Sequence, residues 1–230
     1  ATPDAQEARG LGDVYKRQKL NAAAYNLPFP DIKEEILDLA SIQGDCFFST
    51  DCTAAFNQIE IHPTSRPLLA FQCTTPKNDG QYRYTRLCFG WRSASSIFYG
   101  IMLEILPGIN TPDQNGTVKC FIDDLGGRAK DKQAMFRLLT ILFSRLRTAN
   151  VQLSIKKSKF FTPFLDFVGV RITQDGYSVS PSRLEILEKY PDFDVKAAGK
   201  RGELKLYGFY NYHRSYVKSY ATHEKRMRTA

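Results

Sequence analysis

The stretch VKCFIDDLGG at residues 118–127 contributes most to predicting the fold. Its apolar run predicts a buried strand that ends at Asp123 and Asp124, which we place at a tight turn with two glycines close behind. The stretch CFFSTDC at residues 46–52 has the same character, a buried strand that ends at a carboxylate, Asp51. Two strands that end in aspartate predict a carboxylate-bearing edge on one sheet.

Helical patterns surround these two strands. Asp31 and Glu34 have the spacing of a capping box ahead of a short amphipathic helix. A second helix is predicted over residues 94–106, ended by the Pro-Gly pair at 107–108. A third, core-facing helix is predicted over residues 131–148, where apolar residues recur at helical spacing. These residues are Met135, Leu138, Leu139, Leu142, Phe143 and Leu146.

Turn signals predict two β-hairpins. The first covers residues 66–90, and its predicted turn residues are Pro76, Asn78, Asp79 and Gly80. In the second, FLDFVGVRI at 164–172 is predicted to pair with YSVS at 177–180 across residues 174–176. Ser180-Pro181 has the pattern of a helix start, and the chain from Leu184 onward is predicted to be helical. Strands and helices without a strict βαβ alternation indicate the α+β class.

Composition is that of an ordinary globular protein with one large domain or two small ones. The chain has 230 residues, of which 43% are hydrophobic and 24% charged. No apolar run approaches the roughly 18 residues of a membrane span, so we expect no membrane partner. The absence of a signal-peptide pattern favours the cytoplasm or the nucleus.

Charge and cysteine content narrow the function classes. The net charge of +8 favours a polyanionic partner, nucleic acid above all, although many ribosomal and membrane-surface proteins are as basic. The five cysteines are scattered and form no C-x-x-C pair, which argues against a disulfide framework and against a zinc site. We expect them to be small buried side chains.

Residues 1–18 show no clean periodicity and are predicted to be a tail. The segment GLGDVYKRQ at residues 10–18 is similar to translated adapter sequence, so we expect an artefactual junction near Gln18. A terminal disordered segment is the alternative.

The aspartates at the two strand ends have the chemistry of a metal centre. Three carboxylates brought together repel one another and are stabilised by a cation. Hard oxygen ligands suit Mg²⁺, and two such ions about 3.5–4 Å apart can hold the attacking and leaving oxygens of a phosphoryl displacement. The alternative for Asp123-Asp124 is an ordinary hairpin turn, and for Asp51 an ordinary strand end.

Three segments carry a specific resemblance. DCTAAFNQ at residues 51–58 resembles the first polymerase motif of reverse transcriptases, D-x-x-x-(G/A)-(F/Y)-x-Q. FIDD at 121–124 resembles their (Y/F)-x-D-D box, and LCFGWRSASSIF at 87–98 resembles L-P-F-G-L-x-N-A-P-x-x-F of the gypsy type. Further matches follow in the family's order at KLN (19–21), LPFPDI (27–32), GQYRYTRL (80–87) and LYGFYNYHRSYVKSYA (206–221). Over residues 19 to about 221, the chain is identified as a member of the reverse transcriptases of gypsy-type long-terminal-repeat retrotransposons.

The resemblance implies a right-hand polymerase fold of the α+β class. The palm would be an antiparallel sheet of ferredoxin or RRM type with packed helices, joined to partial fingers and a helical thumb. The implied boundaries are a palm start with a fingers remnant (19–58), a fingers β-hairpin region (59–93), the palm (94–178) and a truncated thumb (179–230). The remaining fingers, the connection and the RNase H part of the same polyprotein would be partners of this chain. In the cytoplasm, its place would be a retroelement particle.

The resemblance also implies an RNA-directed DNA polymerase centre. Asp51 and Asp123 would bridge two Mg²⁺ ions, for which Mn²⁺ can substitute, with the carbonyl of Cys52 as an added ligand. Asp124 would belong to the same metal-binding and catalytic set, near the primer end. Lys157, in LSIKKSKFF at 153–161, would protonate the leaving pyrophosphate. The alternative for this lysine is a solvated basic patch.

Contacts to substrates follow from the same resemblance. A dNTP would meet Phe56, whose ring would reject a ribose 2′-hydroxyl, together with Phe89, Gly90 and Lys157. A primer on an RNA or DNA template would meet the following residues: Trp91, Arg92, Ile122, Phe167, Val168 and Gly169. The alternative for Phe56 is a plain core position.

The chain departs from the family pattern at several positions. Gln18 stands where the family has the fingers arginine, Ser95 where it has proline and Tyr99 where it has glutamine. These changes put triphosphate binding by this chain in doubt and leave the carboxylates complete.

Several other functions are alternatives to polymerase activity for a chain with these motifs. A catalytically inactive nucleic-acid-binding or scaffold fragment is the main alternative, and the three intact aspartates argue against it. An RRM module would need paired aromatics on its sheet, for which no motif is found. Intron-encoded and telomere-type reverse transcriptases are closer rivals, and the FIDD box and the NYHR segment favour the gypsy type.

Overall fold

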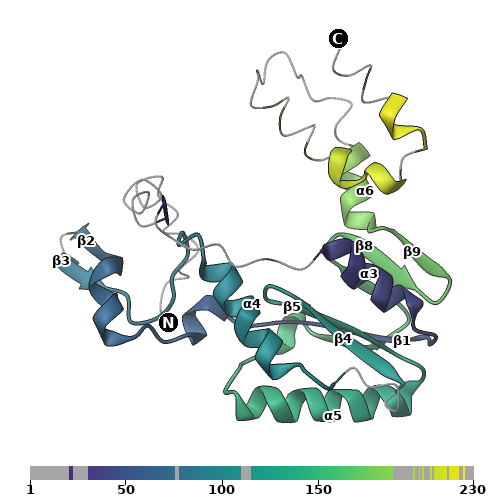
Figure 1. The fold of residues 1–230 in the computed structure, drawn as a ribbon, viewed down its shortest axis with the longest axis horizontal. Helices are drawn as coiled ribbons and strands as arrows, with labels where there is room; N and C mark the ends of the chain where they lie inside the picture. Colours follow the sequence, from purple (N-terminus) through teal and green to yellow (C-terminus); the bar gives the residue numbers. More distant parts are fainter. Residues whose placement is uncertain are drawn as a thin grey trace.

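The computed structural model describes residues 21–22, 31–75, 78–109 and 115–188, and, further on, 199, 202, 204, 208, 210–216, 218–222 and 225. Predictions for the tail at 1–18, for Pro76 and for much of the segment 189–230 therefore lie outside the described residues. In Figure 1 the hairpin of strands β2 (Ala70–Thr75) and β3 (Asn78–Arg83) stands at one end of the molecule and helix α6 (Pro181–Glu188) at the other, with the main sheet between them.

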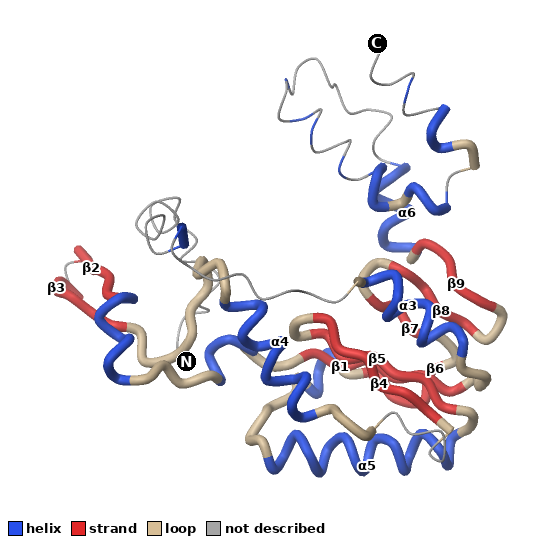
Figure 2. Tube along the Cα trace, viewed as in Figure 1, coloured by secondary structure: helices blue, strands red, loops and turns tan. Residues whose placement is uncertain are grey.

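The main sheet has four antiparallel strands in the order β4-β5-β1-β6 (Figure 2). Strands β1 (Cys46–Asp51) and β4 (Gly116–Phe121) confirm the two predicted apolar strands. Strands β5 (Asp124–Ala129) and β6 (Lys159–Thr162) were not predicted. The sheet is therefore a β1–β5 ladder flanked by two edge strands.

The course of β5 corrects the predicted turn. Asp124 pairs with Phe121 and is the first residue of β5, so the turn consists of Ile122 and Asp123 rather than of the two aspartates. Both glycines behind it lie inside the strand. A Cβ on Gly127 would lie 2.2 Å from Cε1 of Phe48. Glycine is unusual within strands, and here it allows side chains of the neighbouring strand to approach closely.

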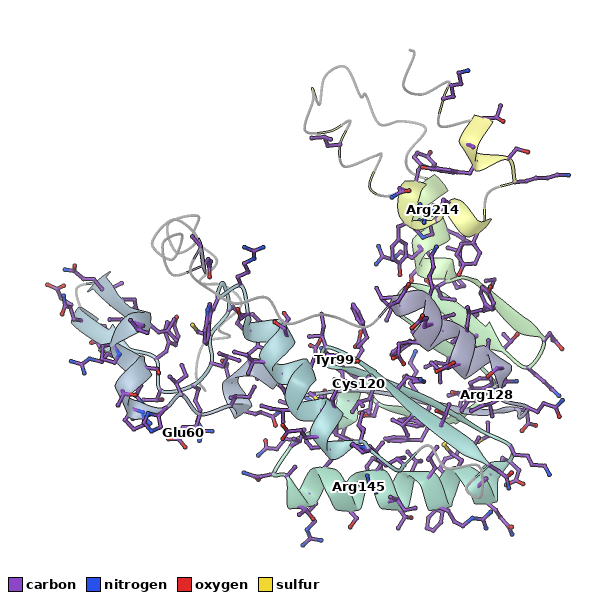
Figure 3. All side chains as sticks on the ribbon, in the orientation of Figure 1. Glu60, Tyr99, Cys120, Arg128, Arg145 and Arg214 are labelled. Carbon is purple, nitrogen blue, oxygen red and sulfur yellow. The ribbon has the colours of Figure 1, made fainter. Side chains whose placement is uncertain are left out.

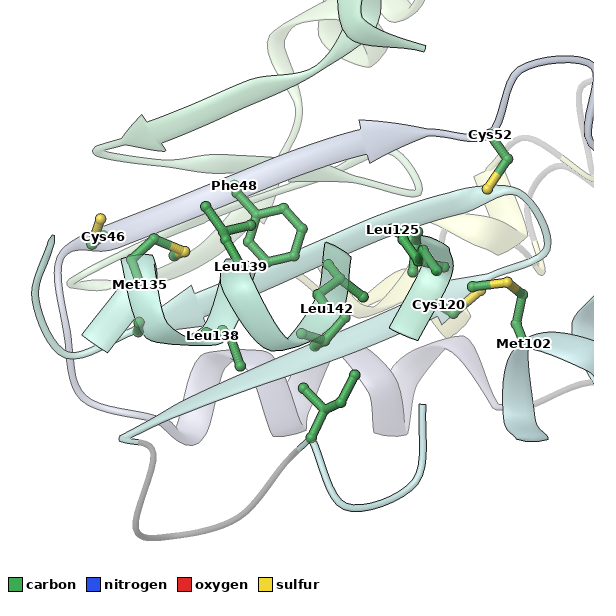
Figure 4. Close-up of a cluster of buried hydrophobic side chains, with 14 of the residues drawn as sticks. Cys46, Phe48, Cys52, Met102, Cys120, Leu125, Met135, Leu138, Leu139 and Leu142 are labelled. Atoms are coloured by element: carbon green, nitrogen blue, oxygen red, sulfur yellow. The ribbon is translucent and has the colours of Figure 1, made fainter. Parts of the chain in front are cut away.

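Two helices cover one face of the sheet. Helix α4 (Ala94–Ile105) and helix α5 (Lys132–Thr148) match the predicted helices, and the side chain of Asp131 caps α5 by accepting from the amide of Ala134 at 2.8 Å. Five of the six predicted apolar positions of α5 are buried against the sheet (Figure 4). The prediction was wrong for Phe143, which is 38% exposed at the helix edge.

Helix α3 and a second sheet cover the opposite face. Helix α3 (Ile32–Ser41) begins at Asp31, whose side chain accepts from the amide of Lys33 and confirms the predicted cap. The second sheet has the order β7-β8-β9, with strands Leu165–Phe167, Val170–Thr173 and Gly176–Val179. FLDFVGVRI is thus two strands rather than one, while its predicted pairing with the next segment is confirmed.

Arg128 ties α3 to the main sheet. This arginine of β5 is 2% exposed, and its guanidinium donates to the carbonyls of Gly44 at 2.8 and 3.0 Å and of Ala40 at 3.0 Å. Its guanidinium carbon also lies 5.0 Å from the ring centroid of Phe47. Figure 3 shows the side chain beside the end of α3. A buried cation here satisfies the carbonyls that the end of α3 leaves without partners.

The predicted first hairpin is confirmed, with a different turn. Strands β2 (Ala70–Thr75) and β3 (Asn78–Arg83) pair from Ala70–Arg83 to Thr75–Asn78, so Asn78, Asp79 and Gly80 belong to β3 and not to the turn. A 3-10 helix, Pro63–Leu69, precedes β2.

The predicted helix start at Ser180-Pro181 is confirmed by α6 (Pro181–Glu188). Shorter 3-10 helices span Ala55–Gln58, Ile155–Lys157 and Arg214–Tyr216. In the part of the chain described, no helix combines the length and apolar character needed to cross a bilayer.

Candidate active site

Asp51 and Asp124 meet at the end of the β1–β5 ladder. They are partners in its last rung, and the amide of Cys52, directly after β1, donates to the carbonyl of Asp123 at 3.0 Å. The turn residue Ile122 has a φ of 59°, which is rare for a β-branched side chain. The structure therefore brings together the two aspartate-bearing segments, as the sequence predicted.

The carboxylates disfavour one another's charge. Asp124 keeps part of its surface exposed, and its pKa is nevertheless raised to about 6. Partial burial is the largest cause, followed by the charges of Asp123 and Asp51, while the charge of Lys157 lowers the pKa by a smaller amount. Burial also raises the pKa of Asp123, to which the charge of Asp51 adds, while a backbone hydrogen bond and Lys157 lower it in part. A cation at this position would relieve both effects.

Lys157 supplies one such positive charge. Its Nζ lies 2.5 Å from Oδ2 of Asp51, and this hydrogen bond, with the charge of Asp51, raises the pKa of Lys157. The side chain of Asp51 is 16% exposed and that of Lys157 69%. The predicted catalytic lysine therefore belongs to the same cluster as the aspartates.

Backbone contacts fix the lysine-bearing turn to the end of β1. The amide of Ser154 donates to the carbonyl of Asp51 at 2.7 Å, and the hydroxyls of Ser158 and Thr50 lie 2.6 Å apart. Lys157 lies between these two serines, on the 3-10 helix Ile155–Lys157. The turn is thus attached to β1 on both sides of the lysine.

Gln58 holds the segment that leads into this turn. Its Nε2 donates to the carbonyls of Thr53 at 2.5 Å and of Gln152 at 2.9 Å, and its Oε1 accepts from the amide of Gln152 at 2.8 Å. The isolated bridge between Cys52 and Leu153 lies next to these bonds. One amide side chain therefore joins the loop after Asp51 to the segment before Lys157.

The donor set suits a hard divalent ion in its chemistry. Asp51 and Asp123 offer partly buried carboxylate oxygens of the kind that Mg²⁺ prefers. Among the described residues, however, no three or more side chains of the types His, Cys, Asp and Glu form a group able to hold a metal ion as they stand. Cys52, which was predicted to contribute its backbone carbonyl, is buried, and burial raises the pKa of its thiol to about 12.

Phe56, five residues after Asp51 in the chain, forms an aromatic pair with Phe89. Phe56 is partly buried and lies four residues after Cys52 in the chain. Its ring centroid lies 5.2 Å from that of Phe89 and 6.4 Å from that of Phe98. Phe98 is core and Phe89 is 42% exposed, so Phe56 connects the hydrophobic core to a solvent-facing ring. Both the core role and the wall role predicted for Phe56 fit this position.

Asn21 anchors the loop behind Phe89. Its Nδ2 donates to the carbonyl of Gly90 at 3.0 Å, and its Oδ1 accepts from the amide of Arg92 at 2.9 Å. Gly90 has a φ of 85°, a conformation that favours glycine. The indole of Trp91 packs beside a small core cluster, and the side chain of Arg92 is exposed.

The Phe167-Val168-Gly169 hairpin lies against β5. A Cβ on Gly126 would lie 3.0 Å from Cδ2 of Phe167, so this ring packs directly behind the aspartate hairpin. Val168 has a φ of 48°, and its carbonyl accepts a hydrogen bond from the hydroxyl of Tyr212. Ile122 and Val168 thus place two β-branched residues with left-handed backbone at neighbouring turns, a strain that is common at functional sites.

Sequence reasoning gave no role to several residues that shape this site. Gln58 and Asn21 fall within motifs that were recognised, so their family match was the available signal. Ser154 and Ser158 flank the lysines of the quoted stretch at 153–161, and Arg128 lies just after the quoted stretch at 118–127. Their contacts join segments far apart in the chain, and no local pattern reveals them.

Comparisons with known proteins agree with this geometry. A model of the family described as reverse transcriptase (RNA-dependent DNA polymerase) matches residues 9–172. The retrovirus-related Pol polyprotein from transposon opus of Drosophila melanogaster is 30% identical over 211 residues, 90% of this chain and 19% of that protein. The corresponding polyprotein from transposon gypsy is 26% identical over 196 residues, 84% of this chain and 17% of that protein. The chain thus spans about a fifth of the length of these relatives.

A solved structure shows the same fold. The foamy viral protease-reverse transcriptase, in a complex with double-stranded DNA, superposes with a TM-score of 0.74 at 19% identity. The match covers 94% of this chain and 35% of the foamy viral chain. The mixed arrangement of antiparallel sheets and helices described above is therefore that of a polymerase palm, as predicted.

Proposed function

This chain belongs to the reverse transcriptase (RNA-dependent DNA polymerase) family, and on that basis we propose that it is the polymerase core of a gypsy-type Pol polyprotein. It would extend a primer on an RNA or DNA template with deoxynucleoside triphosphates. The observation that carries the proposal is the meeting of Asp51 and Asp124 in one rung, with Asp123 in the turn and Lys157 paired to Asp51.

The reaction would be an in-line phosphoryl transfer. The primer 3′-hydroxyl loses its proton to water and its oxygen forms a bond to the α-phosphorus. The bond from this phosphorus to the oxygen that bridges it to the β-phosphate breaks, and pyrophosphate leaves. Asp51 and Asp123 would hold two Mg²⁺ ions, and the backbone carbonyl of Cys52 would be an added ligand. Asp124 would lie nearby. Such ions neutralise the phosphates and hold the attacking and leaving oxygens.

The remaining residues of the site have roles that their positions support. Lys157, whose ammonium lies at the carboxylate of Asp51, would give a proton to the leaving pyrophosphate. Phe56, braced by Phe98, would close the space that a ribose 2′-hydroxyl needs. Phe89 and Gly90 would complete the nucleotide site.

The primer and template would lie along the neighbouring loops. The residues proposed for these contacts are Trp91, Arg92, Ile122, Phe167, Val168 and Gly169. The hairpin at Val168 is held by Tyr212 from the C-terminal part of the chain, which would keep it in place under a primer terminus.

Primer extension on an RNA template tests the proposal. The assay uses the 230-residue chain and a longer version that carries the flanking Pol segments of the opus relative, each with Asp123→Asn as control. We expect template-directed dNTP incorporation by the longer version and none by its Asp123→Asn variant. Tight RNA–DNA binding without incorporation would favour the alternative, an inactive nucleic-acid-binding or scaffold fragment.

A further inference from the structure

We propose that Lys157 is a built-in counter-cation of Asp51, which a divalent ion must displace before it can bind that carboxylate. The inference rests on the proposed function in one respect, because it takes Asp51 as a ligand of the ion. It adds a competition between a side chain of this protein and the ion for the same oxygen.

The contact itself is the first support. The Nζ of Lys157 lies 2.5 Å from Oδ2 of Asp51. The ammonium therefore occupies the space next to this oxygen that a bound ion would need. Within the described part of the chain, Asp51 is the one aspartate of the three that forms an ion pair, and its partner is Lys157. Lys157 therefore neutralises the carboxylate that is central to the proposed metal site.

The position of the lysine is fixed by the fold, which is the second support. Ser154 is bonded to the carbonyl of Asp51, and Ser158 to the hydroxyl of Thr50, so both ends of the turn are attached to β1. Gln58 attaches the preceding segment through Gln152. With its backbone held so closely, the ammonium can leave Asp51 only by rotation of its own side chain, which is 69% exposed and has room to move.

Charge decides the direction of the exchange. An ammonium brings one positive charge and contacts a single carboxylate, whereas a divalent ion brings two and can bind oxygens of several carboxylates. Rotation of Lys157 away from Asp51 would leave Oδ2 of that carboxylate open to the ion. The displaced lysine would then remain next to the site, where a leaving pyrophosphate needs a proton donor.

Binding of Mn²⁺ alone tests the inference, without nucleotide or nucleic acid. Free Mn²⁺ is measured by electron paramagnetic resonance as the 230-residue chain is titrated. Lys157→Met removes the competing charge at nearly constant side-chain length, and we expect it to tighten Mn²⁺ binding about two- to fivefold, the range for a partly exposed ion pair. Lys157→Arg keeps a positive charge and should bind more like the wild type.

Lys156→Met is the matched control. Lys156 lies on the same 3-10 helix, is exposed and carries the same charge, so its loss reproduces the change in net charge without freeing Asp51. Equal tightening in Lys156→Met and Lys157→Met, or no tightening in Lys157→Met, would overturn the inference. Circular dichroism confirms that each variant is folded.

Asp51→Asn separates this inference from the proposed function. It should weaken Mn²⁺ binding and should abolish the gain of Lys157→Met in the double variant. If Asp51→Asn weakens binding while Lys157→Met brings no gain, the competition is wrong and the metal site stands. If Asp51→Asn binds Mn²⁺ as the wild type does, the ion lies elsewhere, and both the competition and the proposed metal site are overturned.

Discussion

The side-chain amide of Gln58 bonds to the backbone of Gln152 in both directions, with Nε2 donating to the carbonyl at 2.9 Å and Oε1 accepting from the amide at 2.8 Å. These two bonds have the pattern of backbone pairing between strands. They lie directly beside the isolated bridge between Cys52 and Leu153 and extend it by one position. The loop after the first aspartate and the segment before Lys157 are thereby held in a fixed relation.

Gln58→Met keeps most of the side-chain length and removes all of these bonds. We expect the free energy of unfolding to fall by about 1–3 kcal/mol, because the amide of Gln152 and the carbonyl of Thr53 lose their side-chain partner. Urea unfolding followed by circular dichroism measures the change. Gln72→Met, at an exposed position of β2, is the control and should change stability far less. Equal losses in both variants would show that the bonds of Gln58 contribute nothing specific.

Gly127→Ala should destabilise the main sheet. The added Cβ would meet Cε1 of Phe48 at 2.2 Å and the carbonyl oxygen of Thr117 at 2.6 Å, and neither can move without shifting a strand. We expect a loss of about 1–3 kcal/mol or more in the free energy of unfolding, as for other overpacked cores. Gly100→Ala, inside α4 with nothing within 4 Å of the added Cβ, should have the opposite sign, a gain of about 0.5–1 kcal/mol. Thermal melts of the two variants decide the matter.

Arg128→Lys tests the link between α3 and the main sheet. A lysine keeps the charge but has no planar fork, so it cannot donate to the carbonyls of Gly44 and Ala40 at the same time. We expect a loss of about 1–3 kcal/mol in urea unfolding, from buried acceptors that lose their donor. The exposed Arg137 of α5 gives the control, Arg137→Lys, which should leave stability nearly unchanged. A neutral Arg128→Lys would contradict the role assigned to the guanidinium.

Asp124 should give the fold a measurable pH dependence. Its pKa of about 6 in the folded chain lies above the value of about 3.9 for an unfolded aspartate. The folded chain therefore binds more protons between about pH 4 and pH 6, so the free energy of unfolding falls as the pH rises through this window. Asp124→Asn removes this contribution, which the difference between the two unfolding curves isolates from other titrating groups.

Carboxyl NMR provides a direct check of the same group. The resonance of Asp124 should titrate with a midpoint near pH 6, and Lys157→Met should move the midpoint upward, because the charge of Lys157 lowers this pKa. A midpoint near 4 in the wild type would contradict the electrostatic coupling of the cluster.

The elements that the sequence predicted well are those whose pattern is local. Strand β1 and helix α5 carry their periodicity within their own residues, and the cap at Asp31 lies next to the helix that it begins. Strand β5 was not predicted, because the side chains that crowd its two glycines come from other strands. Phe48 lies against Gly127, and Phe167 lies against Gly126. Strand β6 is only four residues long and basic at its start, which leaves too short a pattern to recognise.

The candidate site divides in the same way. Asp51, Asp123 and Lys157 were found because each belongs to a motif with a chemical reason for its residues. The bonds that place them were not found, since Gln58 meets Gln152 and Ser154 meets Asp51 only after the chain has folded. Sequence thus pointed to the candidate groups, and the structure shows the contacts that hold them.

Strand β1 belongs to two cores at once. Phe47 is buried on the face shared with α3 and the second sheet, and Phe48 on the face shared with α4 and α5. Neither layer can separate from β1 without exposing a ring, so the backbone amides of β1 should be among the last in the chain to exchange with deuterium. Asp51 is the final residue of this strand. The proposed nucleotide transfer would accordingly depend on a strand whose hydrogen bonds are broken least often by local unfolding.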